Sequence, residues 1–219
     1  MQTKWQAFTR VWISPSTFKV PIAWVKTGWW LLLGAPLLWL LYQISIELSA
    51  PNTALGADPG EAVVHYLGTW SIRLLLLAFS ITPLYRLTRF TEIARSRRLV
   101  GLWAFTYVSL HMLAYLFFFV QFDLRALLND FVERAYITAG MLAMGCLLVL
   151  ALTSTRGWQR RLGRRWRQLH WAVYPAVVAA IIHFLWFTRD QFGEVLLYAL
   201  WFAIAVGVRL YFRTARKAS

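Results

Sequence analysis

The chain has 219 residues, of which 59% are hydrophobic and only 15% are charged, and its formal net charge is +14. A soluble domain usually has roughly 45–50% apolar and 25% charged residues, so this composition excludes an ordinary soluble protein and predicts a membrane protein. The single cysteine, Cys146, excludes a disulfide framework, a CxxC redox pair and a thiolate-bound iron–sulfur cluster. The basic residues alternate with apolar segments of membrane length, which argues against nucleic-acid binding.

Six apolar runs of membrane length follow one another along the chain. Because a spanning helix needs about 20 predominantly apolar residues, each run predicts one transmembrane helix. The runs cover residues 28–46, 70–87, 99–119, 136–152, 166–187 and 195–212. Residues 49–60, between the first two runs, are rich in helix breakers and predict an ordered loop or turn. The sequence therefore predicts an all-α, six-helix bundle, a single membrane domain over residues 1–219 whose loops leave no room for a soluble nucleotide or flavin domain.

The charged residues predict the orientation of this bundle. Of the 23 Lys and Arg residues, 19 lie in alternate segments, namely the N-terminal lead, residues 86–98, residues 156–167 and the tail from residue 209. The other three connections contain eight of the nine acidic residues. Because Lys and Arg near span ends are retained on the cytoplasmic side, both termini are predicted to be cytoplasmic.

Three of the four histidines lie within predicted spans. His111 is in the third span, His170 and His183 are in the fifth, and His65 is expected just outside the second span on the acidic side. One such histidine would be read as a packing residue, but ionisable side chains at membrane depth are costly, and as a group they mark a ligand site or a transport pathway.

His111 and His183 are predicted to lie at similar depths. His111 is 13 residues beyond Arg98, and His183 is 16 residues beyond Arg167, which is a mismatch of roughly 4.5 Å along the helix axis. Two neutral imidazoles at one depth suit the two axial positions of a haem iron, so this pair is predicted to clamp a haem. The chain has no CxxCH motif, so such a haem would be bound non-covalently.

His170 and Arg73 mark two further candidate positions. His170 precedes His183 by 13 residues, or roughly 20 Å along a helix, and therefore predicts a second site near the cytoplasmic face. Its occupant is a haem with one histidine or a different second ligand, a flavin, a quinone, or nothing, in which case His170 packs among Trp166 and Trp171. Arg73 either extends to the outer surface or binds a haem propionate or an anionic quinone head.

Several segments resemble one family of membrane proteins. They are residues 152–163 (LTSTRGWQRRLG), residues 97–105 (RRLVGLWAF) and residues 81–84 (ITPL). These are similar to the MsrQ family, formerly called YedZ, which comprises the haem-binding membrane subunits of the bacterial periplasmic methionine sulfoxide reductase system. The resemblance covers nearly the whole chain and implies a ferric-reductase-like transmembrane fold with a core over about residues 66–187.

The resemblance also implies a function. Such subunits reside in the bacterial inner membrane, take electrons from the respiratory quinone pool and pass them through b-type haem, one or two per chain, to the periplasmic molybdopterin enzyme MsrP, which carries out the sulfoxide reduction. The family's ligand histidines fall on His111, His170 and His183. An FMN cofactor is implied too, and a cytoplasmic flavin reductase is the alternative donor. The larger ferric reductases have two histidines in helix three, where this chain has one.

Two other classes of function remain open from the sequence alone. A histidine-lined metal or proton transporter is favoured by the three intramembrane histidines and disfavoured by the near absence of carboxylates within the spans. A membrane assembly factor, in which the histidines only pack, is the third.

Overall fold

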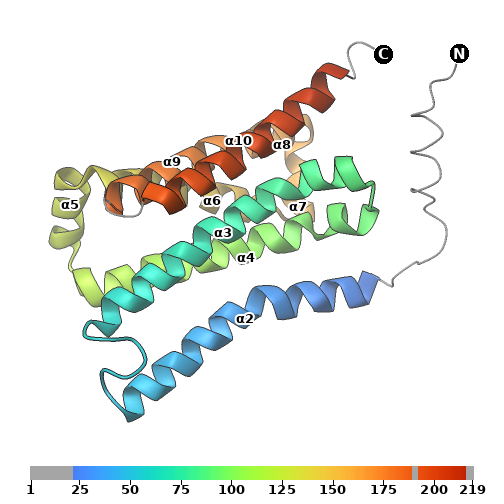
Figure 1. The fold of residues 1–219 in the computed structure, drawn as a ribbon. Helices are drawn as coiled ribbons and strands as arrows, with labels where there is room; N and C mark the ends of the chain where they lie inside the picture. The colour runs from blue at the N-terminus through green and yellow to red at the C-terminus, as the bar shows by residue number, and fades with distance from the viewer. Residues whose placement is uncertain (1–21, 189–191, 216–219) are drawn as a thin grey trace, which may run out of the picture.

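Long helices dominate the computed structural model, which describes residues 22–188 and 192–215 (Figure 1). Six helical segments of the described chain are long and apolar enough to cross a membrane, as the sequence predicts. The long helices are α2 (Ile22–Ser49), α3 (Pro59–Thr88), α4 (Thr91–Tyr115), α6 (Ala135–Leu152), α9 (Val173–Phe187) and α10 (Phe192–Ala215). A π-helical turn, Leu116–Val120, extends α4. The all-α fold class is thereby confirmed.

The short helices lie at opposite ends of the bundle. Helix α5 (Leu124–Glu133) is at one end, and α7 (Arg156–Leu162) and α8 (Arg164–Leu169) are at the other, together with the turn between α3 and α4 (Figure 1). The first residues of α2 and the last of α10 lie at this same end, which we call the basic end because it collects the described parts of the four basic segments. Part of the predicted charge pattern lies outside the described residues, namely Lys4, Arg10, Lys19, Arg189, Asp190, Arg216 and Lys217.

The second predicted helix is longer than the apolar run indicates. Helix α3 begins at Pro59 instead of residue 70. The Asp58 side chain accepts a hydrogen bond from the Glu61 N–H at 2.9 Å, and Pro59 occupies the first turn, where its missing N–H costs nothing. Hydropathy alone misses these turns because they contain polar residues. His65, predicted just outside the second apolar run, lies on these added turns of α3.

Helix α3 is the central helix of the bundle. Half of the residues in its most apolar stretch are buried, compared with 17–22% in the other five spans, and it contacts α2, α4, α9 and α10. The outer helices expose many large apolar side chains, as expected for surfaces that face lipid rather than water. Residues on the inner faces of α3 and α4 are consequently well placed to form a buried site.

The fifth predicted helix is divided into pieces. Gly163 has φ 51°, a left-handed conformation that favours glycine, and separates α7 from α8. A 3₁₀ turn, His170–Ala172, then joins α8 to α9. Pro175 explains this turn, because it lacks the N–H that would bond to the carbonyl of Trp171 in a regular helix. His170 and His183 therefore do not share one regular helix, contrary to the ideal-helix spacing used in the sequence prediction.

Candidate cofactor-binding site

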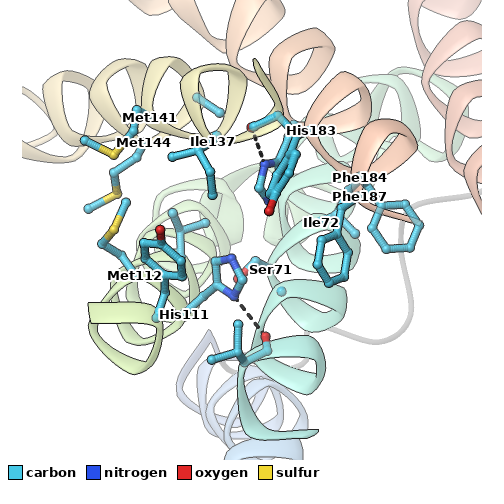
Figure 2. A pocket seen from close by; sticks show the side chains of 18 of the residues that line it. Ser71, Ile72, His111, Met112, Ile137, Met141, Met144, His183, Phe184 and Phe187 are labelled. Carbon is cyan, nitrogen blue, oxygen red and sulfur yellow. Dashed lines mark hydrogen bonds between the residues drawn. The ribbon is translucent and has the colours of Figure 1, made fainter. Parts of the chain in front are cut away.

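The structure brings His111 of α4 and His183 of α9 together. Their ring centroids are 6.2 Å apart, and the ring planes are inclined at 77°. Figure 2 shows the two rings facing one another across a cavity of about 200 Å³. Two histidines that are 72 residues apart in the sequence thus form one pair, at the depth that residue counting indicates.

Each ring of the pair is fixed by a backbone carbonyl of a neighbouring helix. His111 Nδ1 lies 2.9 Å from the carbonyl oxygen of Val64 on α3, and His183 Nδ1 lies 2.6 Å from that of Tyr136 on α6. A carbonyl only accepts, so Nδ1 carries the proton in both rings and donates it. The Nε2 atom of each imidazole therefore retains its lone pair for a metal, which is the arrangement usual for metal-ligating histidines.

The spacing of the pair fits a metal clamped from both sides. Two imidazoles that each bind one metal ion at about 2 Å place their ring centroids about 6 Å apart, and the observed 6.2 Å agrees with this value. Among the described residues, no group of three or more His, Cys, Asp or Glu side chains is placed to hold a bare metal ion. The two imidazoles therefore fit an iron that brings its own equatorial ligands, as haem does.

The rest of this paired-histidine cavity is largely apolar. Figure 2 shows sulfur-containing side chains on one side of the two rings, from Met112, Met141 and Met144, and aromatic and aliphatic ones on the other, including Phe184 and Ile72. Apolar walls exclude water and leave few competing hydrogen bonds. The cavity is thus suited to a large planar cofactor of low polarity.

Polar residues of this cavity include several that the sequence reading missed. His65, Glu61 and Arg134 all line it. Arg134 forms an ion pair with Asp130 at 3.2 Å, and the hydroxyl of Tyr136 and the charge of Asp130 raise the pKa of the Arg134 guanidinium. The role predicted for Arg73, a partner for an anionic edge of the cofactor, therefore fits Arg134 instead.

His170 lies in a separate cavity of about 260 Å³ near the basic end, which we call the His170 cavity. Its Nδ1 is 3.1 Å from the Trp166 carbonyl oxygen, and its ring centroid is 3.9 Å from that of Trp166. Four arginines also line this cavity, namely Arg95, Arg97, Arg98 and Arg209.

Arg209 gives the His170 cavity an unsatisfied donor. Its guanidinium lies 3.9 Å over the ring of Phe79 and donates to the Phe79 carbonyl oxygen at 2.5 Å. Its Nε is buried and has no hydrogen-bond partner in the part of the chain that the structure describes. A buried donor of this kind needs an acceptor, so the cavity fits a ligand with an anionic or carbonyl group.

A thin apolar partition separates the two cavities. Leu75 of α3 and Leu147 of α6 line both of them. Both side chains are buried. The two cavities are therefore adjacent along the bundle and share a wall of leucine side chains.

Arg73 belongs to neither cavity. Its Nε donates to the Tyr198 hydroxyl at 2.9 Å, its Nη2 lies 4.0 Å from Glu194 Oε1, and its guanidinium lies 5.4 Å from the Trp70 ring centroid. These residues line a groove between α3 and α10. The structure therefore does not bring Arg73 to the site of His111 and His183.

Comparison with known proteins agrees with this architecture. The family model described as "Ferric reductase like transmembrane component" matches residues 67–181, a range that includes His111 and His170 and ends two residues before His183. The bundle is thus of the ferric-reductase-like transmembrane class.

Similar chains define the family more narrowly. The heme-binding subunit MsrQ of protein-methionine-sulfoxide reductase from Xanthomonas campestris pv. campestris (strain 8004) is 39% identical over 183 residues, or 84% of each chain. The MsrQ of Xanthomonas axonopodis pv. citri is 40% identical over 81% of each chain, and that of Yersinia pseudotuberculosis is 36% identical over 86% of this chain and 90% of its own. The chain belongs to the MsrQ family.

Proposed function

We propose that this protein is a b-type haem electron-transfer subunit of the bacterial inner membrane, which passes electrons from the respiratory quinone pool to the periplasmic methionine sulfoxide reductase MsrP. The observation that carries the proposal is the pair His111 and His183, with centroids 6.2 Å apart and both Nδ1 atoms bonded to backbone carbonyls. Relatives at 36–40% identity are named as heme-binding subunits of a methionine-sulfoxide reductase. Sulfoxide reduction itself then resides on the partner.

The residues of the paired-histidine cavity have separate roles in this proposal. A haem held between His111 and His183 supplies a one-electron carrier when bound. The carbonyls of Val64 and Tyr136 hold the imidazoles in the Nδ1–H form and increase the electron donation of Nε2. The apolar side chains keep water from the iron, and Arg134 is the candidate partner for a propionate.

The His170 cavity is proposed as a second cofactor site. The four arginines of the cavity together favour an anionic group, and the unpaired Nε of Arg209 supplies a donor for it. A second haem that uses His170 as its single histidine ligand and an FMN with its phosphate among the arginines both have this chemistry. Release of flavin on denaturation, measured beside the haem content, distinguishes them.

The orientation follows from the charges at the two ends. We propose that the basic end faces the cytoplasm, because Lys and Arg near span ends are retained there. The opposite end, with α5 and the connection from α2 to α3, then faces the periplasm and meets MsrP (Figure 1). A cytoplasmic flavin reductase, as the alternative donor, would approach the basic end near the His170 cavity.

The test is reconstitution of the purified full-length chain. Pyridine haemochrome quantitation is expected to give one or two haems per chain, and quinol is expected to reduce them. Addition of MsrP and a methionine sulfoxide substrate is expected to reoxidise them. A protein with no low-spin haem absorbance would refute the proposal, and metal flux through liposomes by such a protein would indicate a transporter instead.

A further inference from the structure

Residues of α3 and α4 that surround His111 have counterparts on α6 and α9 around His183, at a constant offset of 72 residues. The pairs of corresponding residues around the two imidazoles are Val64 and Tyr136, Gly68 and Gly140, and His111 and His183. In both halves the histidine follows the residue that accepts its hydrogen bond by 47 positions. The two halves of the paired-histidine cavity are therefore built in the same way.

The repeat extends beyond the hydrogen bonds. Eight further pairs that differ by 72 in residue number all line the paired-histidine cavity. Four of them are Ser71 and Ala143, Leu75 and Leu147, Val108 and Ala180, and Tyr115 and Phe187. Most of these pairs differ in chemistry, so the shared feature is position. Only Gly, His and Leu recur unchanged among the pairs named here.

The two glycines lie directly against the imidazole rings. A Cβ atom added at Gly140 would be 2.8 Å from His183 Nδ1, and one added at Gly68 would be 3.0 Å from His111 Cε1 and 3.1 Å from Nδ1. Carbon and nitrogen atoms that are not bonded to each other are normally at least 3.4 Å apart, so an alanine at either position would force the ring to move. In each helix the carbonyl that accepts the Nδ1–H belongs to the residue one turn before the glycine.

We propose that Gly68 and Gly140 are positioning residues for the two axial histidines. Each glycine leaves open the space through which an imidazole reaches the carbonyl one turn earlier, so that the Nδ1–H bond forms and Nε2 is aimed into the cavity. The inference rests on the proposed haem site and deepens it, because it assigns the orientation of the ligands to two residues that do not touch the iron. The same packing fixes the 77° between the ring planes.

This proposal predicts a spectroscopic effect as well as weaker binding. The largest g value of a low-spin ferric haem depends on the angle between its two axial imidazole planes, so it reports the ring orientation directly. Loss of the hydrogen bond from Nδ1–H to the backbone carbonyl also makes Nε2 a weaker electron donor to a metal. Both changes are measurable on the purified protein without any turnover assay.

The experiment compares three glycine variants of the full-length chain. Gly140→Ala and Gly68→Ala are expected to lower haem affinity by about 10–100-fold and to shift the largest g value, with the greater effect for Gly140→Ala because its contact is the shorter. Gly145→Ala is the matched control, because Gly145 also lies on α6 and has no atom within 4 Å of the added Cβ. It is expected to match the wild type.

The outcomes separate this inference from the proposed function. Wild-type haem affinity and g values in both Gly140→Ala and Gly68→Ala would overturn the positioning role while leaving the haem site in place. A wild-type chain without haem would overturn the proposed function itself. Alanine has a higher helix propensity than glycine, so general unfolding is not expected. If Gly140→Ala nevertheless fails to accumulate in membranes, Gly68→Ala decides the question by the same two measurements.

Discussion

The two cavities of this bundle share a scaffold and differ in chemistry. The paired-histidine cavity presents two neutral imidazoles, His111 and His183, among apolar side chains. The His170 cavity presents one imidazole and four arginines. The two cavities differ at one pair of corresponding positions, because the residue 72 positions before His170 is Arg98. Near the basic end, α4 thus supplies an arginine where the turn before α9 supplies a histidine.

This substitution changes what each cavity can bind. Two facing imidazoles are a symmetric clamp for an iron, and they add no charge to the site. One imidazole with several guanidiniums is asymmetric and strongly cationic, so it favours an anionic ligand and leaves at least one position on a metal to another donor. Two helix pairs with corresponding positions thus support two different sites, one above the other along the bundle.

The largest expected effect is the loss of the symmetric clamp. His111→Ala and His183→Ala are each expected to abolish the low-spin haem signal of the paired-histidine cavity, because a haem iron with one remaining imidazole becomes high-spin or dissociates. Optical spectra of the reduced, purified variants measure this. His65→Ala is the control and is expected to keep the signal, since His65 lines the same cavity and its ring packs 6.0 Å from that of Phe187. Unchanged spectra in both axial variants would rule out this assignment.

A second imidazole added to the His170 cavity tests whether the missing histidine explains how the two cavities differ. Arg98→His is expected to give the His170 cavity a second imidazole, and therefore about one additional low-spin haem per chain, or the conversion of a one-histidine haem to the low-spin form. Haemochrome quantitation and the absorbance spectrum report both. Leu99→His is the control, because Leu99 also lies on α4, beside Arg98, and does not line the cavity. Equal behaviour of the two variants would show that the repeat does not govern this cavity.

Loss of the single imidazole should have a more limited effect. His170→Ala is expected to release the ligand of the His170 cavity and to preserve the low-spin spectrum of the paired-histidine cavity, because the leucine partition separates the two sites. Haem and flavin contents of the purified variant are measured together. If neither cofactor decreased, the His170 cavity would have no role in cofactor binding.

The smallest effect is expected at Arg73, which belongs to neither cavity. Arg73→Gln removes the interactions with Tyr198, Glu194 and Trp70. Both side chains of the ion pair are partly exposed, at 39% and 45%, so the loss of stability should be about 1 kcal/mol or less. Thermal melts should therefore shift slightly, and cofactor contents should stay the same. A loss of haem would instead show that Arg73 contributes to cofactor binding.

Much of the architecture was predictable because lipid imposes simple rules. Apolar length alone identified six spans, and the depths of His111 and His183 indicated that they could meet. The start of α3 was not predictable from hydropathy, since its first turns contain Glu61 and His65 and are stabilised by a local cap instead. The break at His170 also depends on local backbone chemistry, through Pro175.

The supporting residues of the site were harder to find than the ligands. A glycine has no chemical signal of its own, and the role of Gly68 and Gly140 appears only when the distance to a ring on another helix is known. The arginines of the His170 cavity were read as orientation signals, although Arg209 extends into the bundle from α10. One signal was available in the sequence, namely the equal separation of 43 residues between Gly68 and His111 and between Gly140 and His183.

The partition formed by Leu75 and Leu147 has an energetic consequence. Leucine side chains carry no group that exchanges protons, so an electron that crosses this wall is not accompanied by a proton along the same path. Such a transfer moves net charge across part of the membrane. In the proposed orientation electrons move outward from a cytoplasm that is electrically negative, and a full crossing would gain about 2.3 kcal/mol per 100 mV of membrane potential. The resting voltage of the cell would then favour repair of oxidised proteins outside it.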